Sequence, residues 1–374
     1  MRTPARILVV DDEPGMVRAV ERVLGGVHDV AGSHSSVGAL ALARQFNPDL
    51  VVLDVRMPEI DGFELMARLK AELPGIDIIV MTGSLDDLDQ KLIRAIRGRA
   101  FYFIQKPFDR EVLQTLVDRC LELRWRRLES RQHVARLEKE LAEARAFQQG
   151  LLPVRDMAID RLAVSCRYAP CVELGGDLCD YVSIGEGRVA LLVADVMGHG
   201  VSAAMLTGVV KSAFRASSPA LYEPRSMVQR LWSNMEAFGP ERFVTLIAAV
   251  VSLNERRVDY VNAGHPAGLI FGAHRGVSRL ASTGPLVSSA FRECTWEQRT
   301  AAFERGDRLL FYTDGISDAL AGPDDDGEEA IVQMVHAHRA ASVPLLDALL
   351  AQVEAHFGGH PQPDDLTLLS VEMR

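Results

Sequence analysis

The sequence predicts an α/β domain with a doubly wound parallel sheet, followed by a long helix and then an α+β domain. Three observations lead to this prediction. Short apolar runs alternate with helical patterns as far as about residue 108, glycine and proline are absent from 109–149, and hairpin patterns begin near residue 150. The length of 374 residues agrees with it, because one ordinary hydrophobic core rarely extends over so long a chain.

The composition, with 48% hydrophobic and 25% charged residues, is typical of a soluble globular protein. The net charge of −10 argues against a nucleic-acid surface. No apolar run is long enough to span a membrane, and the N-terminus lacks the apolar core of a signal peptide. We therefore expect a cytoplasmic protein that binds neither nucleic acid nor membrane. Its five cysteines form no CxxC pair and are expected to be reduced packing residues.

Near-continuous apolar runs in the first part of the chain are typical of parallel strands that helices cover on both faces. The runs are expected to form the first, third, fourth and fifth strands of the sheet, at 6–11, 50–54, 77–82 and 100–106. Helical patterns separate them, at 14–24, 35–46, 62–71 and 86–97. In a sheet of this kind, binding sites lie at the carboxyl ends of the strands.

Charged and hydroxyl side chains follow four of these strands. Asp11 and Asp12 follow the first, Asp54 the third, Thr82 the fourth and Lys106 the fifth. Three carboxylates at close range repel one another, and Mg²⁺ removes that conflict. Together with an amine and a hydroxyl, they form the set needed to receive a phosphoryl group on a carboxylate. The alternative is that the paired aspartates cap a helix and that the lysine is a solvated turn residue. It explains each residue alone, but not why all of them follow successive strands.

Residues 6 to about 120 resemble the response-regulator receiver domain of two-component signalling, in "VVDDEP", "LVVLDVRMPEIDGFE", "MTG" and "KPF". The resemblance implies a flavodoxin-like fold and phosphorylation of Asp54 by a histidine kinase or phosphotransfer protein. Phe103 stands where tyrosine is commoner. The implied site residues are Asp11, Asp12, Asp54 and the carbonyl of Arg56 for Mg²⁺, and Thr82, Phe103 and Lys106 for the switch.

The stretch without glycine or proline predicts one long helix. We expect a receiver domain at 1–120, a helical linker at 121–150 and a further domain at 151–374. Apolar residues at spacings of three and four favour a two-stranded coiled coil, and hence a homodimer. The alternative is a helix packed on its own domains. The apolar positions are Leu113, Leu116, Val117, Cys120, Leu123, Leu137, Leu141 and Ala144.

The third part of the chain has patterns of hairpins rather than of βα units. Two hairpins are expected, at 180–195 and 242–264, with two helices between them, at 199–218 and 223–238. Further strands are expected near 268–281, 292–303, 307–313 and 366–373. Antiparallel sheets flanked by helices are therefore predicted.

Four aspartates in this part, Asp177, Asp195, Asp314 and Asp364, lie at the ends of apolar or glycine-rich runs, and Asp365 follows the last. Because no lysine or histidine accompanies all of them, two divalent cations are the expected partners. Asp195 is best placed to bridge the cations. Such a site lowers the pKa of a bound water for attack on phosphorus, which predicts hydrolysis of a phosphate ester without a covalent intermediate. Each aspartate alone is also compatible with a turn.

Residues 147–374 resemble the PPM-type (protein phosphatase 2C-like) serine/threonine phosphatases of the bacterial SpoIIE- and RsbU-like subgroup. The matching segments include "ARAFQQGLLP", "ELGGDLCDY", "ADVMGHGVSAAML", "NAGHPAGL", "LLFYTDGISDA" and "DDLTLL". The resemblance implies an αββα sandwich, two Mn²⁺ or Mg²⁺ ions, and a phosphorylated STAS-type anti-sigma-factor antagonist as substrate. Its implied metal ligands are Asp195, the carbonyl of Val196, Asp314 and Asp364, with Asp177 in the shell of metal-bound water.

The two resemblances together indicate a phosphorylation-gated phosphatase in a partner-switching pathway. The alternative is a weakly active or inactive adaptor that binds a sigma factor or other regulator through the phosphatase-like domain. Retention of all four acidic residues favours the enzyme. His199 and His265 are expected to be structural, and Lys211 and Arg215 to be charges on a helix surface.

Overall fold

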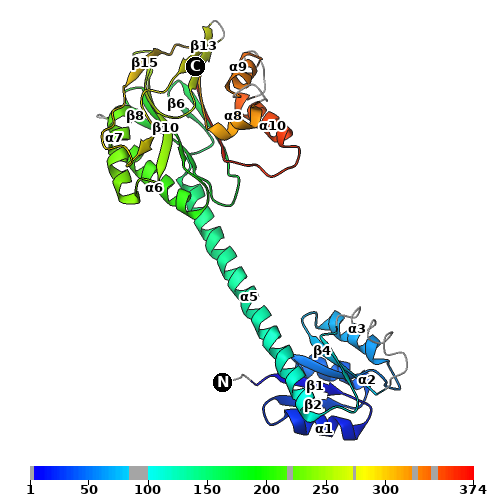
Figure 1. The fold of residues 1–374 in the computed structure, drawn as a ribbon. Coiled ribbons are helices and arrows are strands. Elements are labelled where there is room, and N and C mark those ends of the chain that lie inside the picture. Colours follow the sequence, from blue (N-terminus) through cyan, green and yellow to red (C-terminus); the bar gives the residue numbers. More distant parts are fainter. Residues whose placement is uncertain (1–3, 84–99, 217–221, 273–274, 322–326, 338–343) are drawn as a thin grey trace. The chain divides into compact units, whose positions relative to one another are not determined.

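The computed structural model describes residues 4–83, 100–216, 222–272, 275–321, 327–337 and 344–374. The chain divides into two compact units, at 1–137 and 138–374, and each is described by itself (Figure 1). The predicted helix at 86–97 lies outside the described residues.

The N-terminal unit is built on a parallel sheet with the strand order β2-β1-β3-β4-β5. This confirms the predicted doubly wound α/β fold. The strands are β1 (Arg6–Val10), β2 (Asp29–Ser33), β3 (Leu50–Asp54), β4 (Asp77–Thr82) and β5 (Tyr102–Gln105). The helices that flank them are α1 (Pro14–Leu24), α2 (Ser36–Phe46) and α3 (Gly62–Glu72).

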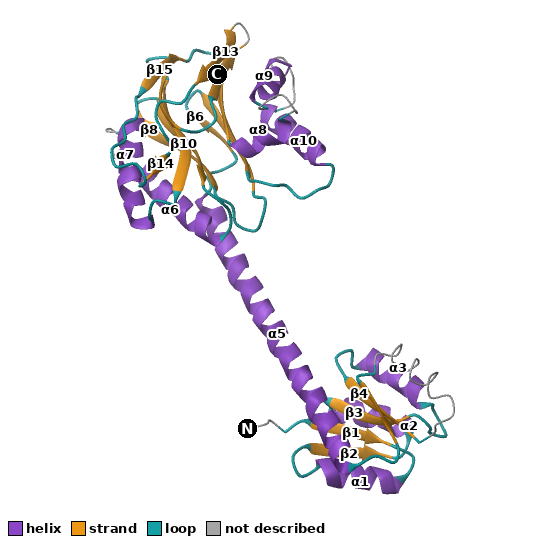
Figure 2. Ribbon diagram, in the orientation of Figure 1, coloured by secondary structure: helices purple, strands orange, loops and turns teal. Residues whose placement is uncertain are grey.

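Helices cover both faces of this sheet, as the continuous apolar strands require (Figure 2). Residues of α2 and α3 join one hydrophobic core, and residues of α1 and of the first turns of α5 (Arg110–Leu151) join the other. Ser35 caps α2 by accepting a hydrogen bond from the N–H of Gly38. Because helices cover both faces of the sheet, the carboxyl ends of the strands are the part of it that is left open.

The helix α5 runs without interruption over 42 residues. Its first turns place Leu113, Val117 and Cys120 in the core of the N-terminal unit. Near its end, Gln148 is buried in the C-terminal unit. The predicted long helix is therefore present.

The C-terminal unit contains two antiparallel sheets. One has the order β15-β11-β10-β9-β8, with β14 paired to β10, and the other has the order β13-β12-β16-β17-β7-β6. The first comprises β8 (Asp177–Gly185), β9 (Arg188–Val196), β10 (Phe243–Ser252), β11 (Arg257–Ala263), β14 (Val287–Ser288) and β15 (Arg299–Ala302). The second comprises β6 (Asp156–Ile159), β7 (Leu162–Ala169), β12 (Gly268–Gly272), β13 (Arg275–Leu280), β16 (Asp307–Tyr312) and β17 (Leu366–Met373).

The two sheets pack face to face, with helices outside each (Figure 1). A central core draws its residues from both sheets. A second core lies under α6 (Val201–Arg215) and α7 (Pro224–Met235), and a third lies under α8 (Asp314–Leu320), α9 (Glu328–Ala337) and α10 (Leu345–Phe357). These layers confirm the αββα sandwich.

A disulfide joins Cys166 in β7 to Cys179 in β8. The expectation that all cysteines are reduced is therefore wrong for these two. They are 13 residues apart in the sequence and lie in opposite sheets, but both belong to the core between the sheets, and this packing brings the sulfurs together. Cys120, Cys171 and Cys294 are free.

Among the helices that the structure describes, none combines the length and the apolar character that crossing a membrane requires.

Candidate functional site

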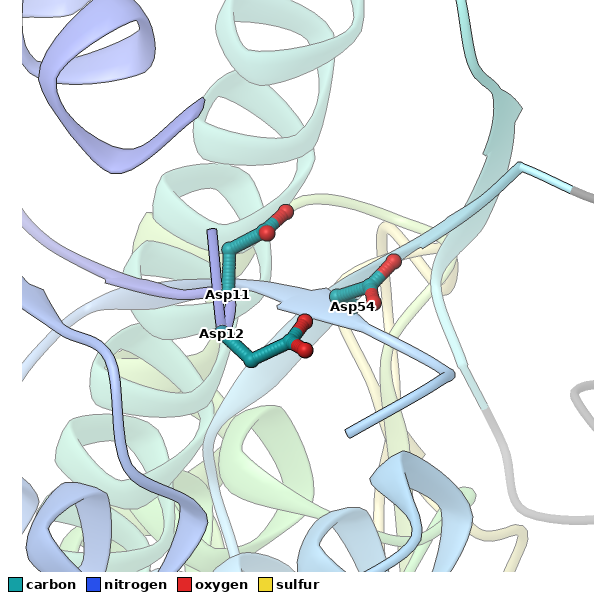
Figure 3. Close-up of side chains that lie close together, drawn as sticks. All are labelled: Asp11, Asp12 and Asp54. Carbon is teal, nitrogen blue, oxygen red and sulfur yellow. The ribbon is translucent and has the colours of Figure 1, made fainter. Parts of the chain in front are cut away.

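The acidic cluster of the N-terminal unit lies where β1 and β3 end. Asp11, Asp12 and Asp54 each offer a carboxylate oxygen, and these oxygens lie within 4.8 Å of one another (Figure 3). Asp11 and Asp54 are 0% and 4% exposed, whereas Asp12 is exposed. Buried carboxylates this close disfavour one another's ionised form unless a cation accompanies them.

Lys106 supplies one such cation. Its Nζ lies 2.6 Å from Oδ2 of Asp11 and 2.8 Å from Oδ1 of Asp54. Burial alone lowers the pKa of Lys106, but its hydrogen bonds to the two carboxylates outweigh burial and raise it. Burial raises the pKa of Asp54 despite the lysine, and the charges of Asp11 and Asp12 add to that effect. The peptide bond from Lys106 to Pro107 is cis.

The other predicted residues of this cluster lie around Asp54. Thr82 is fully buried, and among the described residues its hydroxyl has no hydrogen-bond partner. The N–H of Arg56 donates to Oδ2 of Asp54 at 3.2 Å. Phe103 is partly buried against the core under α2 and α3, and in the sheet it is paired with Val80 rather than with Thr82.

The acidic residues of the C-terminal unit come from both of its sheets. Asp177 begins β8 and is paired directly with Asp195 on β9. Asp314 begins α8, directly after β16, and Asp364 lies in the turn before β17. Since β16 and β17 are antiparallel neighbours, the end of one strand meets the start of the other. The four aspartates are thus brought to one end of the sandwich.

The pKa values of Asp195, Asp177 and Asp314 show that these side chains are buried and that neighbouring carboxylates repel one another. Burial, and then the charges of Asp314 and Asp364, raise the pKa of Asp195 to about 7. Burial, followed by the charge of Asp195, raises the pKa of Asp177 well above its usual range. Burial and then Asp364 raise the pKa of Asp314. Within the part of the chain that the structure describes, no arginine or lysine forms a salt bridge with any of the four.

Two threonines that the sequence analysis missed fix the orientation of Asp177. The hydroxyls of Thr313 and Thr367 donate to its Oδ2 at 2.7 and 2.6 Å. Both threonines belong to the segments quoted above, one directly before Asp314 and the other directly after Leu366. Their place next to the acidic residues is the signal that could have found them.

Asp364 and Asp365, which are adjacent in sequence, have different surroundings. Asp365 is 3% exposed, and its carboxylate accepts hydrogen bonds from the N–H groups of Cys171, at 2.8 Å, and Gly176, at 2.6 Å. Asp364 is exposed. Both oxygens of Asp365 accept backbone N–H groups, whereas Oδ1 of Asp364 accepts the N–H of Asp365 at 2.8 Å and its Oδ2 has no such bond among the described residues, so this geometry favours Asp364 as the ligand of the pair.

Gly176 packs against the backbone that follows Asp195. A Cβ at Gly176 would lie 2.4 Å from the carbonyl oxygen of Val196 and 2.6 Å from that of Gly198. Only glycine permits this approach. The N–H of Val196 also donates to the carbonyl of Gly176 at 3.1 Å, so the predicted carbonyl ligand has a fixed position.

Lys211 and Arg215 on α6 are not the surface charges that the sequence analysis expected. Both pair with Asp180, which is fully buried: Nζ of Lys211 lies 3.0 Å from its Oδ2, and Arg215 forms contacts of 2.6 and 2.7 Å. Lys211 also donates to the carbonyl of Leu151 at the end of α5. These residues brace α5, α6 and β8 against one another.

His265 lies inside the sandwich and His199 on its surface. His265 is buried, and its Nδ1 lies 2.8 Å from Oγ1 of Thr245. Burial lowers the pKa of His265 to about 3, so the ring is neutral at physiological pH. His199 is exposed, directly before the glycine that begins α6.

The donor set at the end of the sandwich fits divalent cations. Carboxylates and backbone carbonyls are the ligands that Mg²⁺ prefers. The raised pKa values of Asp177 and Asp195 reflect burial first and then the neighbouring carboxylates, which no side-chain cation offsets among the described residues. The cluster of Asp11, Asp12 and Asp54 also fits one such cation; within the described residues, it is the group whose carboxylate oxygens lie within 4.8 Å of one another, close enough to share a single ion.

Two family models match the chain. The model of stage II sporulation protein E (SpoIIE) matches residues 185–374, just over half of the chain. The model of the response regulator receiver domain matches residues 7–118.

Two curated relatives are each 25% identical to the chain. Phosphoserine phosphatase RsbP of Bacillus subtilis aligns over 243 residues, which are 63% of this chain and 58% of that protein. Protein IcfG of Synechocystis sp. aligns over 261 residues, which are 62% of this chain and 41% of that protein. The chain thus spans about half the length of these relatives.

Among solved structures, the SiaA-PP2C domain of Pseudomonas aeruginosa superposes with a TM-score of 0.55 at 19% identity, covering 65% of this chain and 99% of that one. At this identity the likeness shows the fold. The chain belongs to the SpoIIE family, and it carries a response regulator receiver domain ahead of a domain with the PP2C phosphatase fold.

Proposed function

We propose that this protein is a response regulator whose output is a metal-dependent protein serine/threonine phosphatase. One observation carries the proposal: Asp177, Asp195, Asp314 and Asp364 meet at one end of the sandwich, where no described lysine or arginine pairs with them. Carboxylates gathered in this way, with raised pKa values, are typical of a site that binds cations and acts on phosphate.

The residues of the C-terminal site would act as follows. Two Mn²⁺ or Mg²⁺ ions would supply a water of lowered pKa and positive charge facing the phosphate. Asp195, the carbonyl of Val196, Asp314 and Asp364 are assigned as ligands. Asp177 gives its Oδ2 to two threonines, so its Oδ1 is the oxygen assigned to hold and orient a metal-bound water. Hydrolysis then needs no covalent intermediate on the protein.

The receiver would gate this activity through Asp54. Asp11, Asp12, Asp54 and the carbonyl of Arg56 are assigned to Mg²⁺, and Asp54 to the phosphoryl group that a histidine kinase or phosphotransfer protein delivers. The buried hydroxyl of Thr82 is free to meet an oxygen of that group. Lys106, held between two carboxylates, would provide the positive charge. Phe103 completes the assigned switch residues.

The proposed substrate is a phosphoserine or phosphothreonine protein, namely a STAS-type anti-sigma-factor antagonist of a partner-switching pathway. The family match and the similarity to RsbP, whose name is phosphoserine phosphatase, support this choice. In this proposal the receiver domain comprises residues 1–120, the helical linker 121–150 and the phosphatase domain 151–374.

We also propose a homodimer through α5. Large apolar side chains lie exposed along this helix, among them Leu128, Val134, Leu137 and Phe147, at 40% to 73% exposure. Exposed apolar side chains on a helix favour contact with a partner. Light scattering should therefore give twice the 41.1 kDa of one chain, and Leu137→Glu should weaken the association. A wild-type protein that stays monomeric at micromolar concentration contradicts the dimer.

Hydrolysis of a phosphoserine antagonist with Mn²⁺ tests the phosphatase. The wild type should release phosphate, and Asp195→Asn should lower the rate by about 10²-fold or more, because a centre that stabilises transition-state charge is removed. Asp160→Asn, at an exposed turn, is the matched control and should leave the rate unchanged. Equal rates in wild type and Asp195→Asn would rule out the mechanism, whereas no hydrolysis by the wild type would favour the adaptor function.

A further inference from the structure

A basic pocket that the proposed function does not use lies in the N-terminal unit, at the ends of the strands that are opposite Asp54. Asp77, the first residue of β4, and Phe101, directly before β5, both line it, whereas Asp54 is the last residue of β3. The pocket has a volume of about 650 Å³, which is within the range of about 300–1,000 Å³ that is typical of ligand sites.

The helix α5 presents three arginines to this pocket. Arg124, Arg127 and Arg131 are spaced by three and four residues, so they lie on one side of the helix. Lys70, near the end of α3, adds a fourth cation, and Asp77 is the one acidic residue among the described residues that line the pocket. In a chain with a net charge of −10, this local excess of positive charge favours an anionic ligand.

The nearby carboxylates do not satisfy all of these cations. Nη2 of Arg127 lies 2.6 Å from Oδ2 of Asp77. Arg124 lies 3.7 Å from Asp77 and from Asp49, too far for a hydrogen bond, and its buried Nε has no hydrogen-bond partner among the described residues. Arg131 is exposed and forms no ion pair within the described part of the chain. The pocket therefore retains N–H donors for an anion.

Apolar residues, among them Pro74 and Phe101, form the other wall of the pocket. The guanidinium of Arg127 lies over the ring of Phe101, 5.2 Å from its centroid. Nη1 of Arg124 donates to the carbonyl of Gly75, which fixes this second guanidinium beside the same wall. Guanidinium groups bind phosphate through paired N–H donors and also stack on planar rings. Phosphate donors and an apolar surface thus lie side by side.

We propose that the basic pocket binds a nucleotide, with its phosphates on Arg124, Arg131 and Lys70 and its base against the apolar wall and the guanidinium of Arg127. A lone phosphate would fill little of the pocket, and an uncharged ligand would leave its positive charge without a partner. The inference goes beyond the proposed function and does not depend on it, because residues of the N-terminal unit alone form the pocket.

The test is calorimetric binding to the full-length chain in EDTA, so that neither proposed cation site takes part. ATP and GTP carry both halves of the ligand, inorganic tripolyphosphate carries the phosphates alone, and adenosine and guanosine carry the base without phosphate. Arg131→Gln removes a pocket cation that has no ion pair to lose. Arg126→Gln, on the same helix but outside the pocket and 67% exposed, is the matched control for charge.

The wild type should bind ATP or GTP at least 10-fold more tightly than tripolyphosphate or the nucleoside, roughly the contribution of one charged hydrogen bond. Arg131→Gln should weaken nucleotide binding by about 10-fold for the same reason. Arg126→Gln should match the wild type. The inference is overturned if neither nucleotide binds, if tripolyphosphate binds as tightly as the nucleotides, or if Arg131→Gln keeps the wild-type affinity. Equal weakening by both substitutions would also overturn it, because binding would then follow net charge rather than this pocket.

Discussion

The two units both gather carboxylates at strand ends, but among the residues that the structure describes only the receiver provides a cation of its own. Lys106 contacts Asp11 and Asp54 there, at 2.6 and 2.8 Å. At the end of the sandwich, Asp195 and its acidic neighbours have no described lysine or arginine as a partner, and the pKa of Asp195 rises to about 7. One cluster is thus partly neutralised by the fold, whereas the other would need the ions proposed above to relieve its repulsion.

Removal of the lysine should have the largest effect on stability. Lys106→Met leaves two buried carboxylates without their partner, and breaking a buried ion pair on one side typically costs about 3–5 kcal/mol. We expect a loss of about 3 kcal/mol in the unfolding free energy of the receiver, measured by urea denaturation without Mg²⁺.

Mg²⁺ should recover part of that loss, because it can take over the role of the lysine charge. The exposed Lys139, at 79% side-chain exposure, provides the control Lys139→Met, which should stay within about 0.5 kcal/mol of the wild type. If Lys106→Met leaves the unfolding free energy of the receiver unchanged, the lysine does not neutralise the receiver cluster, and the two units do not differ in this respect.

Divalent cations should stabilise the C-terminal unit more than the receiver. A ligand at 100 times its dissociation constant contributes about 2.7 kcal/mol. Hydrogen exchange on the full chain, with Mn²⁺ and then with EDTA, measures the two units separately. Asp195→Asn should remove the effect from the C-terminal unit only. Equal protection of both units by Mn²⁺ would contradict the expected difference in how much divalent cations stabilise them.

In mild acid, His265 and the acidic cluster should change the stability of the C-terminal unit in opposite directions. The pKa of His265 is about 3 when folded and 6.5 in the unfolded chain, because burial disfavours the charged ring, so below pH 6.5 the unfolded state takes up a proton there and the contribution of His265 to stability falls as the pH falls toward 3. For this one proton, the slope of the unfolding free energy against pH is at most about 1.4 kcal/mol per pH unit. The pKa of Asp195 is raised to about 7 on folding, so below pH 7 the cation-free folded state takes up a proton there and the contribution of Asp195 rises.

The difference between the thermal unfolding profiles of the wild type and His265→Gln, from pH 7 to pH 4, measures the slope that is due to His265. The wild type should lose stability relative to His265→Gln as the pH falls, and His360→Gln, at an exposed position, should follow the wild type. A wild-type profile in His265→Gln would assign the acid sensitivity to other groups.

Much of the fold was predictable because its strands are long or strongly apolar. The four strands assigned to the receiver agree with the structure to within about two residues, since their apolar runs are nearly continuous. The edge strand β2 has the sequence DVAGS, with no fully buried residue, and so gave no clear signal. In the C-terminal unit, β6 is also mostly exposed at the edge of its sheet and was missed.

The candidate site was predictable where chemistry follows sequence motifs. The acidic residues were found from their place at the ends of apolar runs. Partners that depend on tertiary packing were not. Lys211 looks like a surface charge until β8 supplies Asp180, and although Thr313 and Thr367 stand next to acidic residues in the sequence, only the fold shows that both contact Asp177. The disulfide was missed for the same reason, since only sheet packing brings its cysteines together.

The four aspartates of the sandwich divide evenly between its two sheets, with Asp177 and Asp195 on one and Asp314 and Asp364 at strand ends of the other. The site therefore exists only while the sheets keep their mutual alignment. A slide of one sheet over the other by a fraction of a residue would separate the ligand pairs before it exposed the core. A measurement of cation binding therefore reports sensitively on the alignment of the two sheets.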